Sequence, residues 1–339
     1  MSSDNDSHGE EAIIQHFLAP LAAGYPGAYG LKDDCAAITP TPGHDLIVKT
    51  DPVAEGVHFF ADDAPEHIGW KALAVNVSDL AAKAAVPRAY LMALSFPMPP
   101  TRDWMQRFAN GLSEAQAAFG MHLIGGDTDR RPGPITISIT VFGEVPTGLM
   151  VRRGTARPGD LIYVTGALGS AAIGLAIRSD RSLGLLDAWG IADDRSQPWI
   201  AALDAYMRPQ PRLGLRGALR AHAAAAMDLS DGLAKDLDRM CRASGCGAIV
   251  QVANVPMLPV VRTAVAAAPK HWQDVLASGD DYEVLAAVAP ENAAAFEAAA
   301  QRDGVAVTAI GAFRAGSGVE LLDAAGAPLT LVRSGWDHF

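Results

Sequence analysis

The sequence predicts an α/β or α+β protein of two domains, with strands and helices mixed in each. At roughly 150 residues per domain, the 339 residues are enough for about two domains with a core each. Strand-like and helix-like patterns alternate along the whole chain. The pattern restarts after Pro158-Gly159-Asp160. We therefore place the junction near residues 147–158 and the two domains at 1–148 and 149–339.

The elements of the first domain follow from the spacing of apolar residues and from the turn residues beside them. Residues 10–19 have the spacing of a short amphipathic helix. Residues 46–50 (LIVKT) form a strand that Asp51-Pro52 ends, because proline lacks the N–H that a ladder needs. Residues 67–85 are alanine-rich and helical, and Ser78 offers a second helix start. The remaining elements are expected at 90–96 (strand), 102–119 (helix), 121–124 (strand) and 135–145 (strand).

The second domain shows the same mixture of patterns. Strands are expected at 161–165, 248–252, 282–288 and 305–313, and helices at 170–177, 213–222 and 232–241. Gly166 and Gly169 fall between the first of these strands and the helix after it, which predicts a tight strand-to-helix turn. Residues 180–197 mix charges with glycine and are expected to form a surface insertion.

Composition and charge exclude several classes of protein. With 27 Lys+Arg against 38 Asp+Glu, the net charge is −11, and no basic stripe for nucleic-acid phosphates is present. The three cysteines form no C-x-x-C pair, so neither a disulfide framework nor a zinc ribbon is indicated. The polar N-terminus is unlike a signal peptide, and no apolar run is long enough to span a membrane. We expect a cytoplasmic protein with no membrane partner.

Aspartates are placed at predicted strand ends and helix starts along the chain: Asp33, Asp34, Asp51, Asp79, Asp127, Asp228 and Asp231. A single aspartate at such a position is more often a helix cap or a turn residue than a functional group. Several together are the hard oxygen ligands that Mg²⁺ takes alongside waters and substrate phosphates. Without a cation, carboxylates brought together would repel one another and raise each other's pKa.

The glycines and arginines give a weaker indication of phosphate binding. Gly125 and Gly126 before Asp127 would let backbone N–H groups approach a phosphate. The chain has no G-x-x-x-x-G-K-[ST] loop, and the glycines at 166–174 lack the G-x-G-x-x-G spacing, which disfavours a P-loop enzyme or a nicotinamide dehydrogenase. At least one of Arg152 and Arg153 is expected in a solvated linker, and the other could contact nucleotide phosphates.

A set of short motifs, taken in order, covers nearly the whole chain. They are DDCA at 33–36, KTD at 49–51, EGVHF at 55–59, KALAVNVSDLAA at 71–82, LIGGDT at 123–128, DLSDG at 228–232, SGDDYE at 278–283 and GWDHF at 335–339. Together they resemble the thiamine-monophosphate kinase family, within the superfamily of aminoimidazole ribonucleotide synthetase and selenophosphate synthetase. Single motifs are shared across that superfamily, whereas EGVHF, DYE and GWDHF bring the kinases closest.

This resemblance implies a fold, an activity and a set of site residues. The implied fold is the aminoimidazole-ribonucleotide-synthetase-like one, with an N-terminal ATP- and metal-binding domain whose mixed sheet forms the barrel of a homodimer, and a C-terminal α/β domain. The implied activity is ATP-dependent phosphorylation of thiamine monophosphate to thiamine diphosphate with several Mg²⁺ ions. Implied metal ligands are Asp34, Thr50, Asp51, Asp79, Asp127, Asp228 and Asp231. Implied ATP contacts are Gly126, Asp127, Arg153 and Ser230, and implied contacts to the thiamine phosphate are His58, Asp280 and Trp336.

Three residues depart from the family pattern. Lys32 stands where glycine is usual, Lys49 where a small hydroxyl residue is common, and Asp280 where the family has glutamate. A metal contact at position 49 would therefore come from the backbone.

The mechanism expected from these residues is direct in-line transfer. The second pKa of a phosphate monoester is about 6, so the acceptor oxygen is already largely ionised and needs no general base. Asp51 and Asp127 then serve the transfer as metal ligands. Two alternatives remain open: another ATP-using enzyme of the superfamily, and a non-catalytic regulator that binds Mg²⁺ and nucleotide. In a third, purely structural reading, every aspartate is a helix cap.

Overall fold

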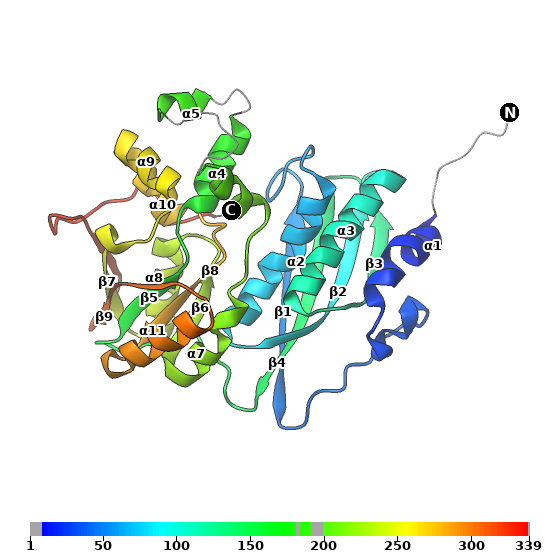
Figure 1. The fold of residues 1–339 in the computed structure, drawn as a ribbon, viewed down its shortest axis with the longest axis horizontal. Coiled ribbons are helices and arrows are strands. Elements are labelled where there is room, and N and C mark those ends of the chain that lie inside the picture. Colours follow the sequence, from blue (N-terminus) through cyan, green and yellow to red (C-terminus); the bar gives the residue numbers. More distant parts are fainter. Residues whose placement is uncertain (1–8, 181–183, 191–198, 338–339) are drawn as a thin grey trace. The chain divides into compact units, whose positions relative to one another are not determined.

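The computed structural model describes residues 9–180, 184–190 and 199–337. The chain divides into two compact units, shown in Figure 1. Unit 1 consists of Met1–Leu80 with Ala85–Gly148, and unit 2 of Ala81–Ala84 with Leu149–Phe339. Each unit has one mixed sheet with helices against it, and the predicted α/β (α+β) fold class is confirmed. No helix in the described part of the chain is both long and apolar enough to cross a membrane.

Unit 1 is built on a four-stranded sheet in the order β1-β4-β2-β3, in which only β2 and β3 run parallel. Its strands are β1 His44–Ala54, β2 Val86–Phe96, β3 Leu123–Arg130 and β4 Thr136–Pro146. Its helices are α1 Glu10–Ile13, α2 Pro65–Ala82 and α3 Arg102–Phe119, and the short helices η1 Ile14–Leu18, η2 Ala19–Ala22 and η3 Pro26–Leu31 follow α1 or precede β1.

Helices α2 and α3 lie side by side on one face of this sheet (Figure 1). Glycines allow their close approach: a Cβ at Gly111 would lie 2.0 Å from the carbonyl oxygen of Glu66, and one at Gly69 would lie 2.5 Å from that of Phe108. The predicted helix at 102–119 has the bounds of α3. Thr101 begins it by accepting a hydrogen bond from the N–H of Trp104, and Gly120 ends it in the left-handed conformation.

Three expectations for unit 1 were wrong in detail. Strand β1 continues through Pro52 to Ala54, because β1 is an edge strand and proline there removes no ladder bond that the sheet needs. Helix α2 runs unbroken, so Asp79 lies in its last turn rather than at a helix start. Residues 10–19 form a single α turn followed by a π-helix instead of one amphipathic helix.

Gly125 and Gly126 lie beyond the strand expected at 121–124, but both belong to β3, which runs on to Arg130. Gly126 pairs with Met92, and a Cβ there would lie 1.8 Å from the carbonyl oxygen of that residue. The requirement for glycine at position 126 therefore comes from the close approach of two parallel strands. Asp127 is presented from within the strand, beside Ala93 of β2.

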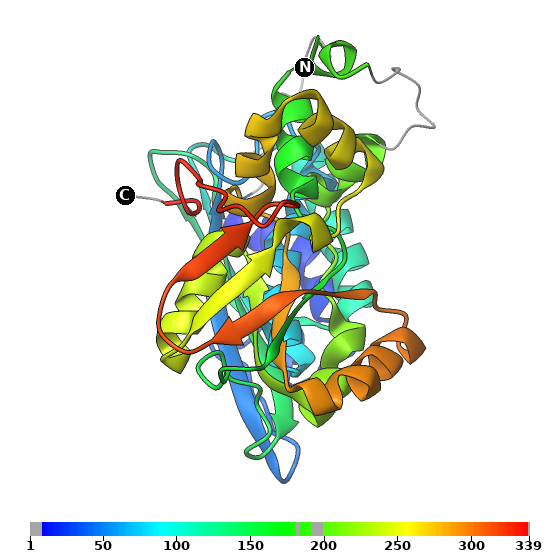
Figure 2. The same cartoon turned by 90° about the vertical axis from the view of Figure 1, so that its left-hand side faces the viewer.

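Unit 2 is built on a six-stranded sheet in the order β10-β7-β9-β5-β8-β6, in which only β10 and β7 run parallel. Its strands are β5 Leu161–Thr165, β6 Ala223–Leu229, β7 Gly247–Gln251, β8 Glu283–Val288, β9 Val307–Arg314 and β10 Val319–Leu322. Its α-helices are α4 Ser170–Ser179, α5 Gly184–Ala188, α6 Trp199–Met207, α7 Arg216–His222, α8 Leu233–Ser244, α9 Pro259–Ala267, α10 Trp272–Ala277 and α11 Ala293–Arg302. In Figure 2 the left-hand side of Figure 1 faces the viewer, and the strands β7 (yellow), β9 and β10 (orange to red) lie in front.

Helices cover both faces of this sheet, because successive side chains of β5 belong to two different buried clusters. Ile162 and Val164 belong to a buried cluster with α4, α8 and α9, whereas Tyr163 belongs to a second cluster with α7 and α11. Side chains of a strand alternate between faces, so the two clusters are the cores on opposite sides of the sheet. Tyr163 packs edge-on against Phe296 of α11, with 5.2 Å between ring centroids.

The predicted strands at 161–165, 248–252, 282–288 and 305–313 correspond to β5, β7, β8 and β9. Strand β6 was missed because its sequence, AAAAMDL, has little of the β-branched character of strands. Strand β10 and helices α6, α9, α10 and α11 were also not predicted. Of the expected insertion at 180–197, residues 184–190 form α5 and a turn, and residues 181–183 and 191–197 lie outside the described residues.

The α2–α3 contact generates a stability prediction. Alanine at Gly111 improves helix propensity but places a methyl group against the backbone of α2. We expect Gly111→Ala to lower the free energy of unfolding by about 1–3 kcal/mol, as overpacking does. Urea unfolding followed by circular dichroism measures it, with the exposed Ser113→Ala in the same helix as the control. A more stable Gly111→Ala protein would contradict the described packing.

Candidate functional site

Strand β1 separates two neighbouring predicted ligands onto opposite faces of the sheet. Asp51 lies on the same face as Lys49, two residues before it, and Thr50 lies on the other. The Thr50 hydroxyl donates a hydrogen bond to the carbonyl oxygen of Ile139 (3.1 Å) and accepts one from the Thr140 hydroxyl (3.0 Å). The assignment of Thr50 as a metal ligand stays a prediction, and its side chain faces away from that of Asp51.

The backbone of Asp51 is held by Asn76, a residue that the sequence reasoning did not single out for this role. The Asp51 N–H donates to Asn76 Oδ1 at 2.8 Å, and Asn76 Nδ2 donates to the Asp51 carbonyl oxygen at 3.3 Å. Asn76 is fully buried in α2 and also donates to the carbonyl oxygen of Ala72. This two-way contact fixes β1 against α2 at the position of a predicted metal ligand.

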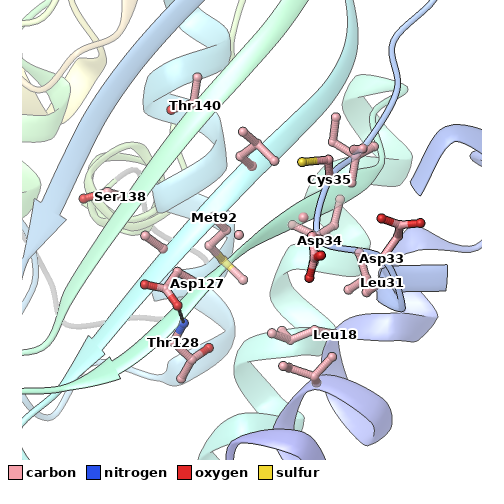
Figure 3. Close-up of a pocket in the computed structure, with 18 of the residues that line it drawn as sticks. Leu18, Leu31, Asp33, Asp34, Cys35, Met92, Asp127, Thr128, Ser138 and Thr140 are labelled. Carbon is pink, nitrogen blue, oxygen red and sulfur yellow. Dashed lines mark hydrogen bonds between the residues drawn. The ribbon is translucent and has the colours of Figure 1, made fainter. Parts of the chain in front are cut away.

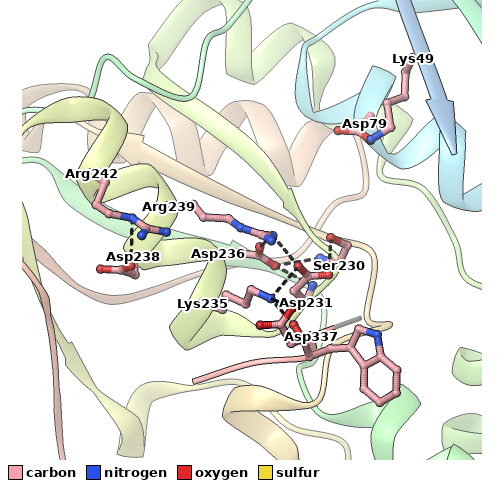
Figure 4. Close-up of polar contacts among 11 residues, drawn as sticks. Lys49, Asp79, Ser230, Asp231, Lys235, Asp236, Asp238, Arg239, Arg242 and Asp337 are labelled. Carbon is pink, nitrogen blue, oxygen red and sulfur yellow. Dashed lines mark hydrogen bonds and ion pairs between the residues drawn. The ribbon is translucent and has the colours of Figure 1, made fainter. Parts of the chain in front are cut away.

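Lys49 brings Asp51 and Asp79 together. Its Nζ lies 3.0 Å from Asp51 Oδ2 and 2.8 Å from Asp79 Oδ2, and Figure 4 shows its contact with Asp79. Burial alone would lower the pKa of Lys49, but the two carboxylates outweigh it and hold that pKa above its ordinary value. In unit 1, a strand and the last turn of a helix thus present two carboxylates to one cation.

A second group of predicted residues in unit 1 lines a cavity of about 760 Å³. Asp34 and Asp127 both contribute to its wall, together with Gly126, and Figure 3 shows these aspartates with the apolar side chains around them. The rest of the lining comes largely from η1, from the segment 31–38 and from the strands β2, β3 and β4. Asp127 Oδ1 accepts a hydrogen bond from the N–H of Thr128 at 2.9 Å.

His58, the predicted substrate contact of unit 1, is held by the backbone. Its Nδ1 accepts a hydrogen bond from the N–H of Ala54 at 3.0 Å. The proton of the neutral ring therefore resides on Nε2. Its contact with substrate stays a prediction.

In unit 2, the loop after β6 presents Ser230 and Asp231, and a buried carboxylate shapes it. Asp236 Oδ2 accepts hydrogen bonds from the N–H of Ser230 (3.0 Å) and the N–H of Asp231 (2.9 Å). Burial raises the pKa of Asp236 to about 6. Arg239 then joins Asp236 to Asp231, at 2.8 and 2.6 Å, as Figure 4 shows. Asp236 was not predicted, although its place in the first turn of α8 is a preferred one for a carboxylate.

Two further loops of unit 2 meet at this one. The N–H of Asp280 donates to the carbonyl oxygen of Ser230 at 2.8 Å, and the N–H of Trp336 donates to the carbonyl oxygen of Asp231 at 3.0 Å. Lys235 contacts the carbonyl oxygen of Trp336 as well as the Asp231 carboxylate. The structure therefore brings together four predicted residues, Ser230, Asp231, Asp280 and Trp336, from three separate motifs.

The other two predicted residues of unit 2 are Asp228 and Arg153. Asp228 is buried near the end of β6, opposite Val284 of β8. Arg153 is exposed, and its backbone carbonyl accepts a hydrogen bond from Ser244. The assignments of Asp228 to metal and Arg153 to ATP stay predictions.

Asp281 is a positioning residue that the sequence reasoning missed. Its carboxylate accepts hydrogen bonds from the N–H groups of Gly169 (2.8 Å) and Ala171 (3.2 Å), and so caps α4 at the glycine turn after β5. Asp280 and Tyr282 on either side adopt positive φ angles of 68° and 50°, which side chains rarely do. The cap holds this unusual backbone, which presents Asp280.

The same loop is fixed on its other side by a buried ion pair. Glu283 forms a bidentate pair with Arg212, at 2.6 and 2.5 Å, and accepts a hydrogen bond from the Thr165 hydroxyl at 2.6 Å. The glycine turn that could have been mistaken for a phosphate loop is therefore filled by carboxylates of the chain itself. A Cβ at Gly166 would lie 1.9 Å from Glu283 Oε1.

Within residues 9–180, 184–190 and 199–337, no group of three or more His, Cys, Asp or Glu side chains is close enough to hold a metal ion by itself. The donors that are present, such as Asp51 and Asp79 around one shared cation, fit Mg²⁺, which usually takes one or two carboxylates and completes its shell with waters and substrate phosphates.

Asp281 generates a prediction on pH dependence. Burial raises its pKa to about 7, while its pKa in the unfolded chain is near the ordinary value of about 3.9. Between these values the folded protein binds the extra proton, so this group's contribution to stability falls as the pH rises from about 4 to 7. We expect the free energy of unfolding of the wild type, minus that of Asp281→Asn, to be smaller at pH 8 than at pH 5.

Urea titrations of both proteins at the two pH values provide the measurement, and the comparison cancels the contribution of Asp236. A difference that stays constant between pH 5 and pH 8 would show that Asp281 is not buried as described.

Comparisons with known proteins support one family. Residues 32–145 match the family described as "AIR synthase related protein, N-terminal domain", and residues 157–323 match "AIR synthase related protein, C-terminal domain". The chain is similar to the thiamine-monophosphate kinase of Caulobacter vibrioides, with 39% identity over 328 residues, or 96% of this chain and 89% of that protein.

Two solved structures are similar over most of their length. The thiamine-monophosphate kinase of Stenotrophomonas maltophilia has a TM-score of 0.78 at 35% identity, covering 86% of this chain and 89% of that one. The complex of AaThiL with AMPPCP and TMP has a TM-score of 0.73 at 27% identity, covering 89% of each chain.

Proposed function

The chain belongs to the thiamine-monophosphate kinase family, and we infer from this that it phosphorylates thiamine monophosphate with ATP, forming thiamine diphosphate. One observation carries the inference: the sequence identity of 39% extends over 96% of the chain. The AaThiL structure with AMPPCP and TMP supports ATP and thiamine monophosphate as the two substrates. The AIR-synthase-related fold expected from the resemblance is confirmed by the same comparisons.

The residue roles are part of the proposal. Metal ligands are Asp34, Thr50, Asp51, Asp79, Asp127, Asp228 and Asp231. ATP contacts are Gly126, Asp127, Arg153 and Ser230, and thiamine monophosphate contacts are His58, Asp280 and Trp336. Residues 1–148 serve ATP, metal and dimer binding, and residues 149–339 form the C-terminal α/β domain. The proposed location is the cytoplasm.

The reaction is a direct in-line transfer to a phosphate oxygen. That oxygen needs no general base, because the second pKa of a phosphate monoester is about 6. The protein's task is to hold two anions in line and to compensate their charge. Mg²⁺, when bound, would supply that compensation, with Asp51 and Asp127 as the ligands that matter most to the transfer.

The neighbourhood of Asp280 and Trp336 suits the thiamine end of the acceptor. Trp336 is partly exposed, with its backbone anchored to Asp231. An indole face attracts the positive charge of a thiazolium ring, and Asp280 adds a carboxylate nearby. The acceptor pocket is what distinguishes a kinase for thiamine monophosphate from other ATP-using enzymes of the superfamily.

Formation of thiamine diphosphate from ATP, Mg²⁺ and thiamine monophosphate tests the function. Thiamine offered in place of thiamine monophosphate should give no product, because it lacks the ionised phosphate nucleophile. We expect Asp51→Asn and Asp127→Asn to lower kcat/KM about 100-fold or more, the loss of roughly 2.7 kcal/mol of transition-state stabilisation. The exposed Asp303→Asn serves as the matched control.

A wild-type protein that binds Mg²⁺ and ATP but releases no ADP with any acceptor would support the regulator instead. Full nucleotide binding and turnover in both variants would favour the reading in which these aspartates are only structural.

A homodimer through the sheet of unit 1 is the second part of the proposal. The face of the sheet opposite α2 and α3 carries exposed apolar side chains, among them Val48, 55% exposed, and Leu46, 37% exposed. Val48 and its cross-strand neighbour Phe142 lie on this face. An apolar face of this kind is typical of a surface that a second copy covers.

We expect Val48→Glu to convert the dimer to a monomer, because the change places a charge on the apolar face. Light scattering coupled to size exclusion measures the mass. Val332→Glu, at an exposed position of unit 2, should leave the dimer intact. A wild-type monomer, or a Val48→Glu dimer, would contradict this arrangement.

A further inference from the structure

Lys49 occupies an unusual place for a lysine. Its ammonium contacts one oxygen of Asp51 and one of Asp79, at 3.0 and 2.8 Å. Both carboxylates are proposed metal ligands. They come from different elements, one from the edge strand β1 and one from the last turn of α2. The ammonium therefore lies at the point where a cation shared by these two oxygens would have to lie.

The contacts are more constrained than those of an ordinary surface ion pair. The side chains of Lys49 and Asp79 are 33% and 20% exposed, so water screens them only in part. Asp51 is held on its backbone by the buried Asn76, and Asp79 belongs to a continuous helix. The backbones that carry both carboxylates are thus held in place, and two carboxylates that share one cation repel each other once that cation is removed.

Lys49 supplies that charge permanently, whereas a divalent ion must bind from solution. Mg²⁺ needs oxygen ligands at 2.0–2.1 Å in near-octahedral geometry, and an ammonium in contact with both oxygens excludes such an ion from the space between them. A dication brought to the same oxygens would also meet the positive charge of the lysine at close range.

We propose that Lys49 is a built-in cation that takes the place of one divalent ion between Asp51 and Asp79. The chain then binds one ion fewer than it would with a short hydroxyl side chain at position 49. This rests on the proposed role of the two aspartates as metal ligands. Lys49 contacts Oδ2 of each aspartate, and Oδ1 of each is the oxygen proposed to contact a metal ion that is not shared between the two.

Counting bound Mn²⁺ tests the proposal without any turnover. Mn²⁺ binds the same hard oxygen ligands as Mg²⁺, and the free ion is measured by electron paramagnetic resonance. The full chain is titrated without nucleotide as wild type, Lys49→Ser, Lys49→Gln and Lys49→Arg. Lys270→Ser, which removes an exposed positive charge in unit 2, controls for net charge.

We expect Lys49→Ser and Lys49→Gln each to bind one more Mn²⁺ per chain than the wild type. The dissociation constant of this extra ion should be at least tenfold lower than that of any Mn²⁺ that the wild type binds between Asp51 and Asp79. Lys49→Arg and Lys270→Ser should match the wild type. Equal counts in wild type, Lys49→Ser and Lys49→Gln would overturn the proposal, and so would an extra ion in Lys49→Arg.

Thermal melting gives a second reading if one variant folds poorly. Without metal, Lys49→Gln should melt below the wild type, and Mn²⁺ should restore most of the difference, while the wild type changes little. A metal-independent loss would overturn the proposal. Turnover of ATP and thiamine monophosphate is measured separately on the wild type. If thiamine diphosphate does not form, the proposed function is wrong, but the Mn²⁺ counts still test the role of Lys49 independently.

Discussion

Compensation of negative charge is the constraint on which this structure depends. The chain carries a net charge of −11 and is proposed to bring two phosphate compounds together. Several of its predicted site carboxylates have a positive or N–H partner within their own unit. Asp51 and Asp79 share Lys49, and Asp231 contacts Arg239 and Lys235. These partners stabilise the folded chain before any metal or substrate binds.

A second set of groups holds the first in place, and its members are fully buried (Asn76 and Asp236) or half-buried (Asp281). Asn76 fixes the backbone of Asp51, Asp236 fixes the loop of Ser230 and Asp231, and Asp281 caps α4 beside Asp280. Burial of an unpaired carboxylate or amide is unfavourable, so each is satisfied by backbone N–H or C=O groups. Precision at the site thus comes from polar residues that are not expected to touch substrate.

Much of the fold was predictable, because apolar periodicity is a local property. The bounds of α3 and β5 were predicted without error, since a threonine cap and a terminal glycine mark α3 and a short apolar run marks β5. Position within a sheet is not local. Proline at 52 is compatible with β1 only because β1 is an edge, and the glycines at 125–126 form part of β3 only because β2 packs so close. Strand β6, mostly alanine, depends on its neighbours entirely.

The candidate site shows the same division. Motif resemblance located Ser230, Asp231, Asp280 and Trp336, and backbone hydrogen bonds join them. It could not locate Asn76, Asp236 or Asp281 as positioning groups, because their partners are backbone atoms that only the folded chain brings near. Nor could it show that Lys49 pairs with both Asp51 and Asp79, since the contact joins a strand to a helix thirty residues away.

The central claim is that this acidic chain transfers a phosphoryl group directly between two anions and that no side chain becomes phosphorylated. The stereochemistry at phosphorus tests it most directly. With ATP made chiral at the γ-phosphorus by oxygen isotopes and sulfur, a single in-line displacement inverts the configuration in thiamine diphosphate. The account predicts inversion. Retention would require two displacements through a phosphorylated residue and would contradict it.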